Sequence, residues 1–347
     1  MRNKEYSWYM LSNAPGFGAK SIHYIYENLQ KNNMSINDLF DLEANQLSRL
    51  FPKIGSGKLS KANFSCFPQL DADDRLYSNF EKLKSDGVAI IALDDGRYPQ
   101  SVLQNMGDDA PPILYCKGYL PLLNQKGVSI VGARDVGDFE IEITKSIAQK
   151  LAENGINVIS GYAKGVDTSA HLGALEAHGT TTMILSFGTN HITIKRELKD
   201  LNWEKNALFV TQFAPYEKFS GQNAMTRNKL LCAMSKAIVV IKSGSERDSS
   251  GKMSGTFDAG KTALEMGIPV FVLSPQKFKS VPQGNIDLIK LGGIEFSNGM
   301  DIVKFFDEHP EQELVTANGQ TDPKPIDKKE TNNKPTKPYQ MSLFDRQ

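Results

Sequence analysis

The chain has 347 residues, 40% of them hydrophobic and 23% charged, which is enough for two folded domains and a tail. Its 40 basic side chains balance 40 acidic ones, so no global field draws the chain to nucleic acid, and any polyanion site must be a local patch. The 3 cysteines are odd in number and far apart, which excludes a disulfide framework and favours a reducing compartment. The sequence has no clustered His/Cys pattern, no secretory leader and no apolar window of membrane-spanning length. We therefore expect a cytoplasmic protein with no metal, no cofactor and no membrane partner.

Residues 1–85 are predicted to form a small helical module. Apolar residues recur at helical spacing, as at Ile22, Ile25 and Leu29. Between two such segments lies the compact turn Pro15-Gly16-Phe17-Gly18. This turn resembles the hairpin of small SAM-like or helix-hairpin modules that approach DNA backbones, and it equally suits an ordinary glycine-rich connection between helices.

Residues 86–307 alternate short apolar segments with segments of helical periodicity, such as the stripe Ile143, Ile147 and Leu151. Strands are predicted at Val88–Leu93, Ile113–Tyr115, Val128–Val131, Ile156–Ile159, Thr182–Phe187, Leu208–Phe213, Ala237–Ile241 and Val270–Leu273. Most are β-branched or apolar throughout, which suits a parallel sheet buried on both faces. The pattern predicts an α/β fold with a doubly wound, mostly parallel sheet.

Residues 308–347 are polar and dotted with proline, and they lack apolar periodicity. This composition predicts a disordered tail.

Two glycine turns with a basic residue follow the first and second strands of the parallel region. Gly132-Ala133-Arg134 is the first, and the second runs from Gly161 to Gly165 and contains Lys164. Helix N-termini with glycine admit a phosphate closely, and both turns fall at the edge where α/β folds bind phosphates. Asp167 stands where an N-cap belongs, and His171, one turn later, suits a packed core histidine.

Two further helix starts face the same edge. Thr226-Arg227-Asn228-Lys229 is expected to open one helix, and Ser254-Gly255-Thr256 opens the next. Many donors converging on one edge suit an extended polyanion better than one small phosphate. Each residue taken singly also suits a structural role, such as an ion pair or a cap.

The sequence does not match known nucleotide-binding or catalytic motifs. Gly132 to Gly137 lacks the second glycine of a dinucleotide fingerprint, and Gly55-Ser56-Gly57-Lys58 lacks the first glycine and the Ser/Thr of a P-loop. Ser160, Asp167 and His171 invite comparison with a catalytic triad, but no nucleophile elbow is present. We expect a protein that binds rather than catalyses.

These motifs together resemble the DprA (Smf) family of DNA-processing proteins, from about Ile90 to Phe296. The segments that carry the resemblance are Asp94-Asp95-Gly96-Arg97-Tyr98-Pro99, Pro111-Pro112-Ile113-Leu114-Tyr115, Val131-Gly132-Ala133-Arg134, Ser160 to Asp167 with Ala170-His171, Arg227-Asn228-Lys229, Ser254-Gly255-Thr256 and Gly284-Asn285. The resemblance implies a Rossmann-like homodimer that binds single-stranded DNA and helps load RecA, without turnover or metal. It implies that Arg134 and Lys195 lie in the DNA groove.

The chain also departs from the family pattern. Tyr-Pro before the groove lysine is Thr193-Ile194 here, the last arginine of Arg-Asn-Arg is Lys229, and Ser245 to Lys252 looks like an insertion. Lys242 and Lys252 add positive charge. The C-terminal winged helix of many members is not found, so we expect a divergent member that serves natural transformation, repair or phage defence.

The end of the tail carries an apolar pair in polar surroundings. Gln340-Met341-Ser342-Leu343-Phe344 resembles the peptide by which bacterial replication and repair proteins hold the sliding clamp. Leu343 and Phe344 would enter an apolar pocket, and Gln340 would add a directional hydrogen bond. Chance, or docking of the pair on the protein's own surface, is the alternative.

The sequence therefore predicts a non-catalytic protein that binds single-stranded DNA, with Phe139 or Tyr162 as the aromatic that stacks on bases. The alternatives are a sensor of a small nucleotide at the same edge and a nucleotide-cleaving enzyme.

Overall fold

The computed structural model describes residues 3–199 and 205–308. The tail, including the predicted clamp residues Gln340, Leu343 and Phe344, lies outside the described residues.

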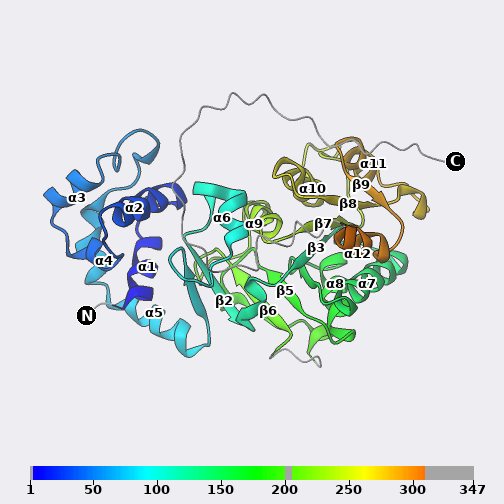
Figure 1. The fold of residues 1–347 in the computed structure, drawn as a ribbon, viewed down its shortest axis with the longest axis horizontal. Coiled ribbons are helices and arrows are strands. Elements are labelled where there is room, and N and C mark those ends of the chain that lie inside the picture. Colours follow the sequence, from blue (N-terminus) through cyan, green and yellow to red (C-terminus); the bar gives the residue numbers. More distant parts are fainter. Residues whose placement is uncertain (1–2, 200–204, 309–347) are drawn as a thin grey trace.

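One sheet organises the described part of the chain (Figure 1), with nine strands in the order β1-β2-β6-β5-β4-β3-β7-β8-β9. The strands are β1 (Ala89–Ala92), β2 (Ile113–Gly118), β3 (Gly127–Val131), β4 (Asn157–Ser160), β5 (Thr181–Ile184), β6 (Ala207–Thr211), β7 (Ala237–Val240), β8 (Val270–Leu273) and β9 (Ile294–Phe296). The pairs β1–β2 and β2–β6 are antiparallel, and the pairs from β6 to β9 are parallel. This confirms the predicted mostly parallel sheet.

Helices cover both faces of this sheet. They are α6 (Gln100–Met106), α7 (Asp138–Glu153), α8 (Val166–Glu176), α9 (Gly221–Ala233), α10 (Gly255–Glu265), α11 (Gln283–Lys290) and α12 (Gly299–Glu308). α7, α8 and α12 pack on one face, and α9, α10 and α6 pack on the other (Figure 1). The central strands are buried throughout because each is covered on both sides.

The N-terminal helices are α1 (Lys4–Ser12), α2 (Ala19–Lys31), α3 (Ala44–Leu50), α4 (Phe67–Asp71) and α5 (Asp74–Ser85). α1 packs against β1 and β2 and is buried from Tyr6 to Leu11, and the ring of Tyr9 meets that of Tyr115 edge-on at 6.4 Å. One apolar core therefore runs from these helices to the sheet. Phe17, from the glycine-rich turn, belongs to that core and stacks near Phe64 and Phe67.

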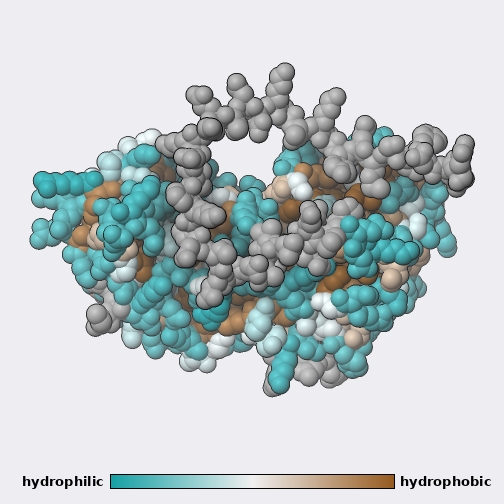
Figure 2. Space-filling view, viewed as in Figure 1, coloured by the Kyte–Doolittle hydropathy of each residue, from teal (hydrophilic) through white to brown (hydrophobic). Residues whose placement is uncertain are grey.

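Hydrophilic side chains cover most of the face seen in Figure 2, and apolar residues show between them.

The sheet contains one topological switch point that matters for ligands. The chain passes from β3 outward through β4, β5 and β6, and then returns to place β7 on the other side of β3. The connections that leave β3 and β7 therefore diverge, and in open α/β sheets a crevice forms at such a point beyond the carboxyl ends of the strands.

Candidate nucleic-acid interface

The switch point opens into a cavity of about 510 Å³, which we call the switch-point cavity. Its walls come from the β3–α7 loop, α9 and the N-terminus of α10. Predicted binding residues that line it are Gly132, Ala133, Arg134, Arg227, Asn228, Gly255 and Thr256. The fold thus brings together residues from three separate motifs.

The loop from Gly161 to Gly165 joins β4 to α8 beside this cavity. Gly165 is the N-cap of α8 with φ of 75°, and a Cβ there would lie 2.6 Å from the carbonyl oxygen of Ala133, so glycine is required. The prediction that Asp167 is the N-cap is wrong, because the left-handed turn at Gly165 starts the helix two residues earlier. Asp167 lies in the first turn, and its carboxylate accepts a hydrogen bond from the N–H of Ala163 at 3.2 Å.

The helix that carries Arg227 also begins earlier than predicted. α9 starts at Gly221, where the hydroxyl of the N-cap Ser220 accepts the N–H of Asn223 at 3.0 Å. The predicted helix start at Thr226 is therefore wrong, and Arg227 lies in the second turn. Its reach to the cavity comes from the length of its side chain and not from a position at a helix N-terminus.

Arg227 is the buried cation of the switch-point cavity. Its side chain is 8% exposed, and its Nε finds no hydrogen-bond partner in the described structure. A Cβ on Gly161 would lie 2.6 Å from its Nη2 and would also meet the carboxylate of Asp167, so glycine at this position leaves room for the guanidinium. Burial lowers the pKa of Arg227, and the charge of Asp167 opposes that shift.

Asn228 and the start of α10 have a mainly structural role. The amide of Asn228 donates to the carbonyl of Gly255 at 3.0 Å and to a carboxylate oxygen of α10 at 3.0 Å. α10 opens at Ser254-Gly255-Thr256, as the sequence predicts. Ser254 is its N-cap, and the hydroxyl of Ser254 accepts the N–H of Phe257 at 3.3 Å. Lys229 is exposed and lines neither this cavity nor the next one.

A second cavity of about 510 Å³, here called the Lys195 cavity, adjoins the first. Its lining residues are Tyr162, Phe187, His191, Thr193, Lys195, Lys218 and Phe219. Phe219 lines both cavities, so both lie beside its side chain. We call the combined surface the trough.

The ammonium group of Lys195 donates most of its hydrogen bonds to groups inside the protein. Its ammonium donates to the carbonyl of Ala163 at 2.6 Å and to the hydroxyl of Thr168 at 2.7 Å, and it lies 4.5 Å from the centroid of the Tyr162 ring. Burial lowers its pKa. Lys195 therefore holds the β4–α8 loop in place, and it also lines the Lys195 cavity.

Phe219 is an aromatic residue of the trough that was not among the predicted stacking residues. It is 53% exposed, and the guanidinium of Arg134 lies 5.6 Å from its ring centroid. The sequence carries one signal of a binding role for this residue: an aromatic side chain follows Lys218 in a loop that precedes a helix. Phe139, one of the two predicted stacking residues, packs edge-on against Phe278 at 5.5 Å and lines neither cavity.

The remaining predicted cations differ in their availability. Lys252, two residues before the N-cap of α10, lines the switch-point cavity next to Met253. Lys164 is exposed but lines neither cavity. Lys242 is paired with Glu140 at 2.6 Å, so its charge is compensated.

His171 and Ser160 are engaged in the core. His171 is fully buried, and burial lowers its pKa to about 3, so it is neutral near pH 7. Since the carbonyl of Gly161 can only accept, Nε2 carries the proton toward it at 2.6 Å. Nδ1 lies 2.7 Å from the hydroxyl oxygen of Thr181, and that hydroxyl donates to the carbonyl of Val158 at 2.7 Å. The hydroxyl of Ser160 donates to the carbonyl of Ile130 at 2.6 Å. These bonds place His171 as the packed residue that the sequence predicts.

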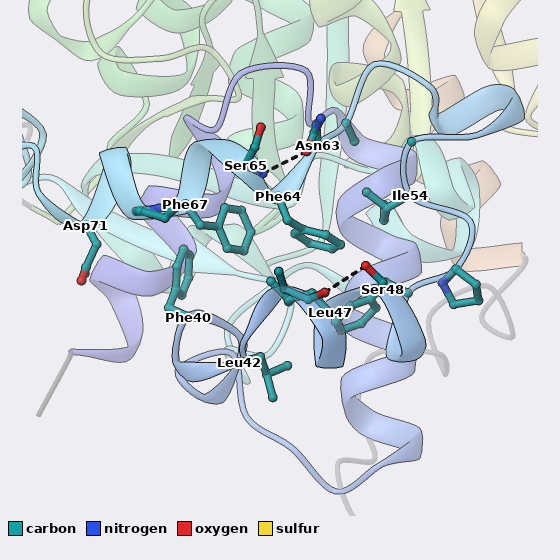
Figure 3. A pocket seen from close by; sticks show the side chains of 16 residues that line it. Phe40, Leu42, Leu47, Ser48, Ile54, Asn63, Phe64, Ser65, Phe67 and Asp71 are labelled. Atoms are coloured by element: carbon teal, nitrogen blue, oxygen red, sulfur yellow. Dashed lines mark hydrogen bonds between the residues drawn. The ribbon is translucent and has the colours of Figure 1, made fainter.

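A separate cavity of about 720 Å³ lies in the helical module (Figure 3). Phe40, Leu42, Leu47, Ile54 and Phe64 point into it, together with a few polar side chains at its rim. Its lining includes no lysine or arginine, so its chemistry differs from that of the trough.

Comparison with known proteins decides the family. The sequence model of "DNA recombination-mediator protein A" matches residues 89–307. The chain belongs to this family. DNA processing protein DprA of Bacillus subtilis is 25% identical over 236 residues, which cover 67% of this chain and 74% of that protein. The DprA of Streptococcus pneumoniae is 28% identical over 241 residues, covering 69% and 79%.

Solved DprA structures share the fold. The X-ray structure of DprA from Streptococcus pneumoniae superposes with a TM-score of 0.66 at 21% identity and covers 88% of this chain and 98% of its own. DprA from Helicobacter pylori, whose structure is described for its single-stranded DNA binding mode, gives a TM-score of 0.53 at 22% identity, covering 64% and 96%. The Rossmann-like architecture predicted from the sequence is thereby confirmed.

Among residues 3–199 and 205–308, no group of three or more His, Cys, Asp or Glu side chains is arranged to hold a metal ion. In the same residues, no helix combines the length and apolarity that crossing a membrane requires.

Proposed function

We propose that this chain binds single-stranded DNA in the trough and acts as a DNA-processing and recombination mediator. The observation that carries the proposal is that two cavities lined by cations lie beside the same aromatic residue, Phe219. Arg134, Arg227 and Lys252 line the first cavity, and Lys195 and Lys218 line the second. An extended row of cations suits a polynucleotide backbone, whereas one small phosphate needs a single cluster.

The trough also offers a surface for bases. The exposed ring of Phe219 lies between the two groups of cations, where an unpaired base can stack while its phosphates meet the basic side chains. A duplex hides the faces of its bases, so this arrangement favours single strands. Membership of the DNA recombination-mediator family supports the same proposal, as does the single-stranded DNA binding named for the Helicobacter pylori relative.

We propose that the protein acts by binding, without turnover. The groups that invited a catalytic interpretation are engaged elsewhere, since Ser160 donates to a backbone carbonyl and His171 is buried and bonded at both ring nitrogens. Family membership supports RecA loading, a homodimer and a role in transformation, repair or phage defence in the cytoplasm. A sliding-clamp contact through Gln340, Leu343 and Phe344 is supported by the sequence of the tail.

The test compares ligands of different length and strandedness on the intact chain. Fluorescently labelled oligo-dT of 5 to 40 nucleotides, the matching duplex and free dTMP are titrated at two salt concentrations. We expect affinity to rise with length, to fall steeply with salt and to be weaker for duplex. Arg134→Ala with Lys218→Ala should weaken binding strongly, and Lys164→Ala, which changes an exposed lysine outside the trough, is the matched control.

Three results would contradict the proposal. Wild-type affinity in the Arg134/Lys218 double variant would remove the trough as the site. Saturation by dTMP with no gain from longer strands would favour the sensor of a small nucleotide. Release of cleaved products, followed by chromatography, would favour the enzyme.

A further inference from the structure

We propose that the cavity of the helical module binds the apolar segment of this chain's own tail, with Leu343 and Phe344 inside it. This cavity, which we call the module cavity, has a volume of about 720 Å³ (Figure 3). It shares no lining residue with the two cavities of the trough. The inference therefore goes beyond the proposed function, because it concerns a second site and does not depend on strand binding.

The module cavity contains apolar side chains that the fold leaves partly uncovered. Phe40, Leu42, Ile54 and Phe64 line it and point into it (Figure 3), yet each is only half-buried. An apolar ligand that removes such a surface from water gains free energy, and concave apolar surfaces are where ligands typically bind. The cavity therefore favours an apolar occupant.

The walls of the module cavity are aromatic rings that hold one another in place. The ring centroid of Phe64 lies 5.1 Å from that of Phe67 and 5.6 Å from that of Phe51. Phe40 in turn lies 4.8 Å from Phe67. Phe51 and Phe67 are buried, so the cluster is anchored in the core and the site is formed in advance. A phenylalanine that entered would meet the edges and faces of these rings, as aromatic pairs prefer.

Charge argues against a nucleic acid and for a peptide with basic flanks. Asp71 lines the module cavity, and its described lining includes no lysine or arginine. A polyanion would therefore meet a carboxylate without a compensating cation. The apolar segment of the tail has Lys334, Lys337 and Arg346 around it, against one acidic residue, Asp345. Charge complementarity therefore favours this segment as the occupant.

The composition of the tail points to a docking role for the same segment. Residues 316–338 contain one large apolar side chain, Ile326. Four large apolar side chains then follow within six residues, and they are Tyr339, Met341, Leu343 and Phe344. Apolar side chains that gather in a polar segment are typical of a surface that binds a partner. The module cavity offers such a partner within the same chain.

The tail is long enough to reach the module cavity. The last described helix, α12, and the helical module lie on opposite halves of the molecule (Figure 1). An extended chain spans at most about 3.3–3.6 Å per residue, so residues 309–342 can cover roughly 110–120 Å. A compact protein of this size has a radius of gyration of roughly 19 Å. Tethering also raises the local concentration of the segment, so even a weak site is occupied.

Docking in the module cavity has a consequence for the sliding-clamp contact proposed above. Both contacts use Leu343 and Phe344, so one tail cannot make them at the same time. The module cavity would then act as an internal competitor that lowers the apparent affinity of the tail for a clamp.

The test replaces Phe344 of the full-length chain by the photo-reactive residue p-benzoylphenylalanine. After ultraviolet irradiation, peptide mass spectrometry identifies the residues joined to it, and we expect them within residues 40–71. Ser48 is exposed and lines the cavity, so Ser48→Trp places an indole over the space. This change should lower the yield of those cross-links about 10-fold, the effect of about 1.4 kcal/mol. Asn45→Trp, at an exposed position of α3 that does not line the cavity, is the matched control and should keep the yield.

A mixture with isotope-labelled chains that lack the photo-reactive group distinguishes the possible occupants. Cross-links to unlabelled peptides support docking within one chain, whereas cross-links to labelled peptides would show that a second copy docks and would overturn the inference. Cross-links outside the helical module, no cross-links, or a yield that Ser48→Trp leaves unchanged would also overturn it.

Hydrogen exchange gives an independent measurement on variants that leave the described residues unchanged. Residues 40–71 should exchange faster in the Leu343→Ala/Phe344→Ala variant than in wild type, because the cavity loses its occupant. Equal exchange in the two proteins would contradict the inference. Each of these negative results would leave strand binding in the trough untouched, since the oligo-dT titration tests that function separately.

Discussion

Replacing Gly161 by alanine tests whether the position of Arg227 matters for binding. Gly161 follows β4 and is buried, and its backbone needs no positive φ, so the change acts only through the added methyl group. That Cβ would overlap Nη1 of Arg227 and the carboxylate of Asp167, and it would lie 2.6 Å from Nη2 of Arg227. Real Cβ contacts essentially never fall below 3.0 Å, so the guanidinium must move.

The expected magnitude follows from these contacts. A hydrogen bond to a charged group contributes about 1.5–3 kcal/mol, so moving Arg227 away from a bound phosphate should weaken binding by about 10- to 150-fold. Crowding a well-packed site typically costs about 1–3 kcal/mol of folding stability. Gly161→Ala should therefore bind oligo-dT much more weakly and unfold at a lower temperature.

The assay is fluorescence anisotropy with labelled oligo-dT, together with thermal unfolding of the same preparations. Gly96→Ala is the matched control, because a Cβ at Gly96 meets nothing within 4 Å and its φ is not positive. Adding Arg227→Ala to Gly161→Ala should recover part of the stability and none of the affinity. If Gly161→Ala binds and unfolds as wild type does, Arg227 has no role in binding from its observed position.

Four further predictions concern the same region. The Phe219→Ala variant should lose about 1–3 kcal/mol of binding free energy for single strands, the typical contribution of one stacked base. The slope of log K against log salt should stay unchanged. The Phe219→Trp variant should keep the wild-type affinity. Arg134→Gln should reduce the slope of log K against log salt by about 0.7, the value for one phosphate of a single strand; an unchanged slope would show that Arg134 touches no phosphate. A double variant with Arg227→Met and Asp167→Asn should not bind single strands. Its melting temperature should stay the same or rise, because the two changes remove a buried charge pair. A large drop in melting temperature would contradict this. His171 is buried in the neutral form with a pKa of about 3. As the pH falls, this imidazole is therefore protonated in the unfolded chain before it is protonated in the folded chain. Stability should fall by up to about 1.4 kcal/mol per pH unit as pH drops from about 6.5 toward 3, and denaturant unfolding of His171→Gln should show a shallower fall.

The parallel strands were predictable from the sequence because a strand covered on both faces carries apolar residues nearly throughout, as β3 and β8 do. β9 was missed because Ile294–Phe296 is short and partly exposed, so its pattern is indistinct. The glycine turns after β3 and β4 were also visible, since glycine and a basic residue follow an apolar run there. Their position at one edge follows from the parallel order of the strands.

The details of the site depended on contacts between distant segments. The N-cap of α8 was misplaced because the left-handed turn at Gly165, packed against the carbonyl of Ala133, sets the helix start. Phe219 was missed because nothing in its local sequence shows that two cavities meet at its ring. The structural role of Lys195 was missed for the same reason, since its partners come from the β4–α8 loop and from α8.

The sequence alone determined the class of fold, the edge of the sheet that carries the basic residues, and the family motifs. These are properties of local pattern and order along the chain. The tertiary structure decided which cations remain available to a ligand: Lys242 is neutralised by Glu140, Lys195 is bonded to the β4–α8 loop, and Arg227 is buried with an unpaired Nε. The physical reason is that the partners of a charged side chain are chosen by the loops and helices that fold beside it, and spacing in the sequence does not specify those neighbours.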